Sequence, residues 1–200
     1  MPVSADSATH EIYQHLLSTI RSERFLKMQG LNNEVPFYIC AFKPQKQNEM
    51  NAMVGQLVNQ LRVQGVRVLH IDLYDLSNEL IQTRRKWDAV INKEPQITKA
   101  QLQELLQGML DPEKHVVPAI AEKIKQDEFE VMFLTGVGEV FPYIRAHTLL
   151  NNLQTTAQGK PLVMFFPGEY IQSNERGSTL SLFGIMQDKY YRAFDINKHF

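Results

Sequence analysis

Val35-Pro-Phe-Tyr-Ile-Cys-Ala-Phe42 and Val66-Arg-Val-Leu-His-Ile71 are two apolar runs with a helical pattern between them. Both runs are short and rich in β-branched or aromatic residues, which is typical of strands. The apolar residues between the runs recur at the spacing of one helical face, and they are Met50, Met53, Val54, Leu57, Val58 and Leu61. Because parallel strands need a crossover connection, usually a helix, residues 35–71 predict a strand–helix–strand unit of a parallel sheet.

The second half of the chain continues this pattern. Residues 130–135 and 161–166 are two further apolar runs, and a helix is expected between them at residues 139–153. A last strand is expected at residues 190–196, after a polar loop at residues 172–178. Strands without polar alternation are buried on both faces of a sheet. The sequence therefore predicts an α/β fold, a three-layer αβα arrangement with a mostly parallel five-stranded sheet.

The residues between the second and third predicted strands should be helical. Three amphipathic patterns follow one another there, separated by Glu94-Pro95 and Asp111-Pro112. Pro118 lies inside the third pattern, so that helix should begin late or bend there. We expect a helical insertion at about residues 73–127, within a single α/β domain that covers residues 1–200.

Composition narrows the class of protein. The chain has 200 residues, 44% of them hydrophobic, and its 21 basic and 22 acidic side chains leave a net charge of −1. Proteins that bind a phosphate backbone usually carry a basic excess, so this balance argues against direct nucleic-acid binding. Cys40 is the one cysteine and lies in an apolar run, which predicts a buried, inert thiol. With no signal-peptide pattern and no apolar stretch near the roughly 20 residues that span a bilayer, we expect a cytoplasmic protein without a membrane partner.

The order of the predicted elements is compatible with the scaffold of the P-loop NTPases, so nucleotide binding would require the phosphate-binding motif of that class. Their phosphate-binding loop is rich in glycine and follows the first strand. Here that loop is Lys43-Pro-Gln-Lys-Gln-Asn48, without glycine, and the Gly159-Lys160 pair precedes a strand rather than a helix. Thr135 stands where an acidic residue would hold magnesium. We expect a P-loop-NTPase-like scaffold that lacks the nucleotide motifs and carries no cofactor.

Two segments after predicted strands are candidates for ligand binding, residues 136–147 and Pro167-Gly-Glu-Tyr170. The first offers two glycines whose backbone N–H groups could receive an anion, and open α/β sheets bind ligands outside the carboxyl ends of their strands. Glu139 and Glu169 could meet there to hold a metal or perform acid–base work. The favoured alternatives are a tight turn, with Glu139 at a helix start, and ordinary surface loops. No catalytic, cofactor-binding or metal-binding residue is predicted.

Several segments form a set that covers most of the chain from about Arg24 onward. They are Asn33-Glu-Val-Pro-Phe-Tyr-Ile39, Ile71-Asp-Leu-Tyr-Asp-Leu76, Pro118-Ala-Ile-Ala-Glu-Lys123, the long segment from Phe133 to Leu153, Val163-Met-Phe-Phe-Pro-Gly-Glu-Tyr170 and Lys189-Tyr-Tyr-Arg-Ala-Phe194. In content and order the set resembles the BrxB family of the bacterial BREX (bacteriophage exclusion) defence systems, and the long segment is the most specific. The resemblance implies a part in phage exclusion and host-DNA methylation, beside an ATPase (BrxC), an alkaline-phosphatase-like protein (PglZ) and an adenine methyltransferase (PglX). It supplies no catalytic residues.

Three classes of function remain open at this point. The favoured one is a non-catalytic adaptor that binds other BREX proteins, first PglZ and otherwise BrxC or PglX. The alternatives are a nucleotide- or metal-dependent enzyme that uses the segments 136–147 and 167–170, and a DNA-binding accessory subunit. Interfaces favour aromatic, Met and Arg side chains. The candidate partner-binding residues are therefore Trp87, Arg84 and Arg85 in the helical insertion and Tyr170, Phe183 and Met186 near the carboxyl end. For Trp87 the alternative is a residue that anchors the insertion to the core.

Overall fold

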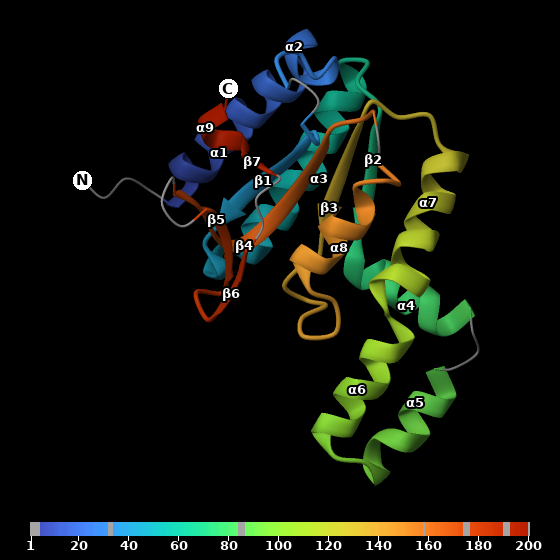
Figure 1. The fold of residues 1–200 in the computed structure, drawn as a ribbon. Coiled ribbons are helices and arrows are strands. Elements are labelled where there is room, and N and C mark those ends of the chain that lie inside the picture. The colour runs from blue at the N-terminus through green and yellow to red at the C-terminus, as the bar shows by residue number, and fades with distance from the viewer. Residues whose placement is uncertain are drawn as a thin grey trace.

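The centre of the molecule is a sheet of five parallel strands. A computed structural model describes residues 5–31, 34–83, 87–157, 159–173, 177–189 and 193–199. The parallel strands follow the order β2-β3-β4-β1-β7 across the sheet (Figure 1). Their bounds are β1 Phe37–Phe42, β2 Val68–Asp72, β3 Val131–Thr135, β4 Leu162–Ser173 and β7 Phe194–Asp195. The predicted α/β class with a mostly parallel sheet is confirmed.

The sheet is apolar on both faces because helices cover both. Successive residues of a strand point to opposite faces, and in β1 Tyr38 and Cys40 join one hydrophobic cluster while Phe37 and Ile39 join the other. All five residues of β3 are buried. Burial on both faces explains why these strands read as continuous apolar runs in the sequence.

One face of the sheet is covered by the first helices of the chain. They are α1 Ala5–Ile20, the short α2 Glu23–Leu26 and α3 Gln47–Val63, which follows the 3-10 turn η1 Pro44–Lys46. Leu16 and Ile20 of α1 and Leu57 and Leu61 of α3 are fully buried in the cluster on this side. The last helix, α9 Ile196–His199, adds Ile196 to the same cluster. This confirms the helical spacing read from the sequence between the first two strands.

Between β2 and β3 the chain is helical, as expected. These elements are α4 Leu73–Thr83, α5 Trp87–Lys93, the 3-10 turn η2 Glu94–Gln96, α6 Lys99–Met109, the π-helical turn η3 Pro112–Val116 and α7 Val117–Gln126. Pro118 lies in the first turn of α7, where its missing N–H costs no hydrogen bond. Thr98 and Gln101 form a capping box that starts α6. In Figure 1, α5 and α6 extend beyond the end of the sheet at which the strands finish.

A β-hairpin at the carboxyl end of the sheet was not predicted. β4 does not end at residue 166 but continues to Ser173, and it pairs with β5 Gly177–Leu182, which pairs in turn with β6 Met186–Lys189. Both pairings are antiparallel, so the sheet has seven strands in all. The expectation of a loop over residues 167–170 and a polar loop over 172–178 is therefore wrong where these residues are described. Of the expected last strand, residues 190–192 lie outside the described residues.

The helix expected at residues 139–153 is shorter than predicted. It is α8, Ala146–Leu153, and turns occupy the preceding residues. Pro142 lacks a backbone N–H and its ring clashes with the preceding helical turn, so a helix cannot run through it. Glu139 accordingly lies in a turn and not at a helix start, which corrects its predicted place. Among the described residues, no helix is long and apolar enough to cross a membrane.

Candidate functional site

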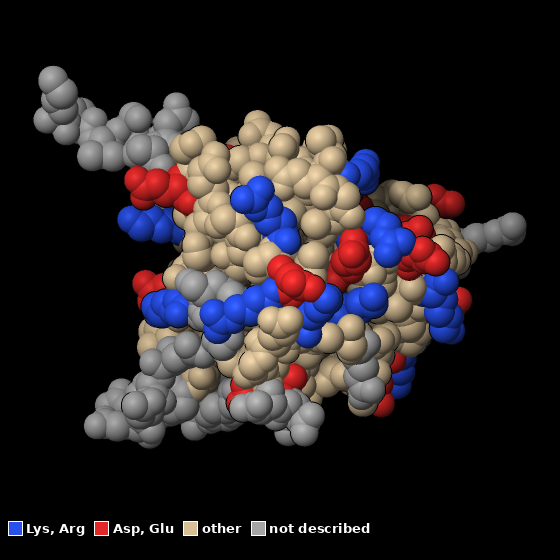
Figure 2. All heavy atoms as spheres, turned by 90° about the horizontal axis from the view of Figure 1, so that it is seen from above, with Lys and Arg blue, Asp and Glu red and all other residues tan. Residues whose placement is uncertain are grey.

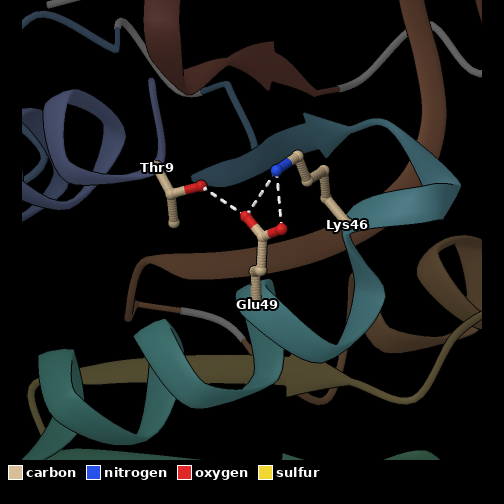
Figure 3. Close-up of polar contacts among 3 residues, drawn as sticks. All are labelled: Thr9, Lys46 and Glu49. Carbon is tan, nitrogen blue, oxygen red and sulfur yellow. Dashed lines mark hydrogen bonds and ion pairs between the residues drawn. The ribbon is translucent and has the colours of Figure 1, made fainter. Parts of the chain in front are cut away.

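The loop after β1 was the candidate for phosphate binding, and Lys46, one of its two lysines, is already paired. Lys46 Nζ lies 2.6 Å and 2.7 Å from the two carboxylate oxygens of Glu49 in α3, as Figure 3 shows. Thr9 Oγ1 of α1 donates a further hydrogen bond to Glu49 Oε2, at 3.2 Å. The hydrogen bond from Lys46 lowers the pKa of the Glu49 carboxyl. A 3-10 turn with a paired lysine does not form the cradle of backbone amides that a phosphate group needs.

At the ends of β2 and β3 a polar network holds the two strands together. Asp72 Oδ1 accepts hydrogen bonds from the backbone N–H groups of Tyr74 and Asp75, at 2.9 Å and 3.1 Å, and so caps α4. Its Oδ2 accepts a hydrogen bond from Thr135 Oγ1, at 2.7 Å. His70 Nε2 lies 2.9 Å from Thr135 Oγ1. Because the Thr135 hydroxyl proton goes to Asp72, we assign the proton of this contact to His70 Nε2. The carboxylate thus makes structural hydrogen bonds within the protein.

His70 lies at an exposed position of β2, but partial desolvation of its ring against Thr135 still lowers its pKa, and the nearby carboxylates of Asp72 and Asp75 oppose that shift only in part. The neutral imidazole is therefore favoured in the folded protein. Burial also disfavours the charged form of Cys40: the thiol is fully buried in β1, and its pKa is raised to about 12. A thiol with this pKa is not a nucleophile near neutral pH.

The two glycines of the turn after β3 are explained by close packing. Gly136 has φ +74°, and a Cβ atom built on it would lie 2.8 Å from Asp72 Oδ1. A Cβ atom on Gly138 would lie 2.9 Å from the Phe183 ring and equally close to Pro167 Cγ. Their absent side chains leave room for the end of β2 and for the β5–β6 hairpin. The space that an anion would need at these glycines is occupied by protein atoms.

Arg145 and His147 also have partners on the hairpin. Arg145 forms an ion pair with Asp188 Oδ1 of β6, and His147 Nδ1 lies 3.0 Å from Asp188 Oδ2. His147 Nε2 lies 3.1 Å from Thr148 Oγ1. These contacts fasten the hairpin to the start of α8 and orient both side chains toward one carboxylate.

The two glutamates that we considered as a possible pair, against the favoured alternative of ordinary surface residues, are both exposed. Glu139 lies in the turn after β3, and Glu169 lies inside β4 opposite Ser181 of β5. Glu169 therefore does not follow a strand end, and the reason for expecting the two carboxylates to meet is lost. Within the part of the chain that the structure describes, no group of three His, Cys, Asp or Glu side chains is arranged to hold a metal ion.

The predicted partner-binding residues divide into buried and exposed ones. Tyr170 is only 4% exposed, and its hydroxyl donates a 2.7 Å hydrogen bond to the carbonyl oxygen of Ala193. The expectation that Tyr170 lies outside the core is therefore wrong, because β4 continues past residue 166. Met186 is half-buried against the core, whereas Phe183 is 38% exposed at the hairpin turn and meets the Phe141 ring edge-on.

Trp87 is 41% exposed in α5 and lines a pocket of about 240 Å³. The pocket lies between α4, α5, α6 and the turn before α8. Its lining residues are Tyr74, Ser77, Asn78, Ile81, Trp87, Val90, Glu94, Leu102, Leu106, Leu110, Glu139, Val140 and Tyr143. Arg84 and Arg85 lie outside the described residues. The sequence singled out Trp87 but missed Tyr74 and Tyr143, because no local pattern shows that these distant segments share one surface.

The fold and the site together define a class: an α/β protein whose strand-end polar groups are engaged with one another and whose exposed aromatic residues line a small pocket. A family model described as "BREX protein BrxB" matches residues 69–196. A BREX protein BrxB of Bacillus cereus (strain H3081.97) is 35% identical over 196 residues, covering 94% of this chain and 96% of the relative. One of Escherichia coli O9:H4 (strain HS) is 29% identical over 177 residues, covering 88% and 86%.

The chain therefore belongs to the BrxB family and is a component of a BREX defence system. The resemblance read from the sequence segments is confirmed. No solved structure matches the chain significantly. Membership in a multi-protein defence system implies other BREX proteins as its partners.

Proposed function

We propose that this chain is a non-catalytic adaptor that binds other BREX proteins and is needed for phage exclusion and host-DNA methylation. The observation that carries the proposal is the exposed Trp87 in a pocket with two tyrosines. Large aromatic residues are enriched among those that dominate binding energy at interfaces. An aromatic pocket on projecting helices is therefore a surface suited to protein binding. We further propose that residues 1–200 form one domain with α4–α7 as its helical insertion.

The strand ends support a non-catalytic role. Lys46 is paired with Glu49, Asp72 with Thr135 and the α4 amides, and Arg145 with Asp188. In a catalytic site such groups converge on one space where a substrate atom can sit, whereas these groups lie at separate positions and each is directed at a partner within the protein. The β5–β6 hairpin adds Phe183 to the same edge of the sheet, against the turn after β3. These contacts favour structural roles for the strand-end residues over the alternative of a nucleotide- or metal-dependent enzyme.

The charge distribution disfavours the DNA-binding alternative. Figure 2 shows the face at the amino ends of the strands, where acidic side chains stand among a row of lysines and arginines. Arg67 is paired with Glu128 at 2.6 Å and lies 3.7 Å from Glu130. Lys125 is paired with Glu122, at 2.7 Å. A lysine or arginine that is already paired with a carboxylate displaces fewer counterions from a nucleic acid. This face therefore provides little of the electrostatic affinity on which binding to a phosphate backbone depends.

A second exposed apolar surface lies at the turn of the hairpin. Ile185 is 80% exposed and neighbours the exposed Phe183. These two residues give the adaptor a further contact surface at the carboxyl edge of the sheet. The alkaline-phosphatase-like PglZ is the partner we propose first, with BrxC and PglX as alternatives.

Affinity purification of the tagged chain from cells that carry the complete operon tests the adaptor role. The proposal expects one BREX protein to be recovered in a fixed ratio after washing in about 0.15 M salt. Parallel purifications from operons that lack PglZ, BrxC or PglX identify the direct partner, since only its deletion removes the complex. Recovery of the chain alone from the complete operon would contradict the adaptor role.

A further inference from the structure

The pocket beside Trp87 has an apolar floor and aromatic walls. Aliphatic side chains of α4, α5 and α6 form its floor, among them Ile81, Val90 and Leu106. Tyr74, Trp87 and Tyr143 stand around it, and Trp87 and Tyr74 leave 41% and 49% of their surface exposed. The aromatic side chains around this pocket are exposed to solvent. Binding of an apolar group would remove their apolar surface from water, which is energetically favourable.

The size of the pocket limits what it can hold. Its volume of about 240 Å³ is below the roughly 300–1,000 Å³ typical of sites for small-molecule ligands and cofactors. A pocket of this size suits one or two apolar side chains. Anchor side chains of protein partners fill pockets of this kind at the centres of interfaces.

A hydrogen bond beside the pocket joins α6 to the turn before α8 and helps to hold these two parts of its lining in place. Gln107 Nε2 of α6 donates a hydrogen bond to the carbonyl oxygen of Pro142, at 3.1 Å. In the same turn, the backbone N–H of Tyr143 donates to the carbonyl oxygen of Val140, at 2.9 Å. A pocket that is formed in advance reduces the ordering cost of binding.

The charged residues that line the pocket in the described part of the chain are both acidic. Glu94 and Glu139 are exposed lining residues, and no lysine or arginine is among the residues that line it in the described part of the chain. The basic residues 84–86 precede Trp87 in the sequence and lie outside the described residues. Complementary charges orient a partner and raise its rate of association. The carboxylates on the lining therefore favour a partner that brings a cation beside its apolar group.

We propose that this pocket binds a segment of another BREX protein in which an apolar side chain enters the pocket and a neighbouring Lys or Arg pairs with Glu94 or Glu139. The inference rests on the adaptor role and adds the chemistry of the bound segment. The apolar side chain supplies most of the affinity, and the cation supplies orientation.

Photocrosslinking in cells with the complete operon tests the proposal. Tyr143 is replaced by photoreactive benzoylphenylalanine, the complex is irradiated and purified, and mass spectrometry locates the crosslinked residue of the partner. The expected crosslink lies within a few residues of an apolar side chain that neighbours a Lys or Arg. A crosslink to an acidic segment, or to a second copy of this chain, would overturn the proposal.

Charge reversal gives an independent readout on the purified complex. Trp87→Ala should weaken binding on the order of thirtyfold, the loss typical of a hot-spot residue. Glu94→Lys combined with Glu139→Lys should weaken binding and reverse its salt dependence, whereas Glu104→Lys, an exposed residue of α6 outside the lining, should not. If the partner is retained with wild-type affinity by all these folded variants, the pocket proposal fails and the adaptor role stands. If wild-type chain retains no partner, the adaptor role fails and the pocket proposal fails with it.

Discussion

Arg145, the residue before α8, forms an ion pair with Asp188 in β6. The pair joins the β5–β6 hairpin to the turn after β3, and His147 Nδ1 lies 3.0 Å from the same carboxylate. Only 18% of the Asp188 side chain is exposed, compared with 40% of the Arg145 side chain. Without the arginine, the largely buried Asp188 carboxylate would lose the ion pair that offsets the cost of removing its charge from water.

Replacement of Arg145 tests this connection. Arg145→Ala should lower the free energy of unfolding by about 1 kcal/mol. Solvent screens the exposed Arg145 and so limits the loss, but the largely buried Asp188 carboxylate would lose its charged partner. Lys125→Ala removes an exposed pair with Glu122 and should change stability by less than about 0.5 kcal/mol. Urea denaturation of both variants provides the measurement. Equal losses would show that the hairpin does not depend on Arg145.

Gly138 and Gly108 form a matched pair for testing close packing. A Cβ atom at Gly138 would meet the Phe183 ring and Pro167 at 2.9 Å, whereas nothing lies within 4 Å of a Cβ atom at Gly108 in α6. Gly138→Ala should destabilise the fold by about 1–3 kcal/mol through overpacking. Gly108→Ala should stabilise it by about 0.4–1 kcal/mol, because alanine restricts the unfolded chain and favours helix. Thermal unfolding of both variants provides the measurement. A higher melting temperature for Gly138→Ala than for Gly108→Ala would contradict the packing of the hairpin on the turn after β3.

Leu150 tests the buried face of α8. It is fully buried among the side chains on one face of the sheet, so Leu150→Ala should cost about 2–5 kcal/mol of stability. Val63 at the end of α3 is 80% exposed, and Val63→Ala should change stability by no more than about 0.5 kcal/mol. Guanidinium denaturation distinguishes these cases, and a small loss at Leu150 would mean that α8 is rotated.

His70 should make the protein less stable as the pH falls. Burial lowers the pKa of its imidazole below 6.5 in the folded state, so the unfolded chain binds a proton that the folded chain resists. The loss begins as the pH falls through about 6.5, the unfolded value, and is complete below the lowered folded pKa. An NMR titration of the His70 ring measures this pKa directly. A pKa at or above 6.5 would show that the carboxylates of Asp72 and Asp75 outweigh the desolvation of the ring.

Burial decided which elements could be predicted from the sequence. The buried runs of β1 and β3 gave clear strand patterns, as strands covered on both faces do. In the β5 strand the buried Leu180 and Leu182 flank Ser181, which is also buried, so the alternation that marks a surface hairpin is missing. Gly184 at the turn, with φ +72°, was the remaining signal for this hairpin.

The candidate site was less predictable than the fold. Pro142 disfavours a helix that begins at residue 139, so α8 begins only at Ala146 and Glu139 lies in a turn. The pocket, in contrast, combines Trp87 with Tyr143 from a distant part of the chain. Helical spacing shows that a residue faces some neighbour but does not identify that neighbour, so the pocket depends on tertiary structure.

Phage plating efficiency in cells whose complete BREX operon carries variants of this chain tests the adaptor account most directly. The account predicts that Lys46→Ala, in the turn after β1, and Glu169→Ala, inside β4, retain exclusion, because the chain performs no chemistry at either position. Trp87→Ala, shown to be folded by circular dichroism and present at the wild-type level, should let phage plate as on cells without the operon. Loss of exclusion in the Lys46→Ala and Glu169→Ala variants together with full exclusion by Trp87→Ala would contradict the account.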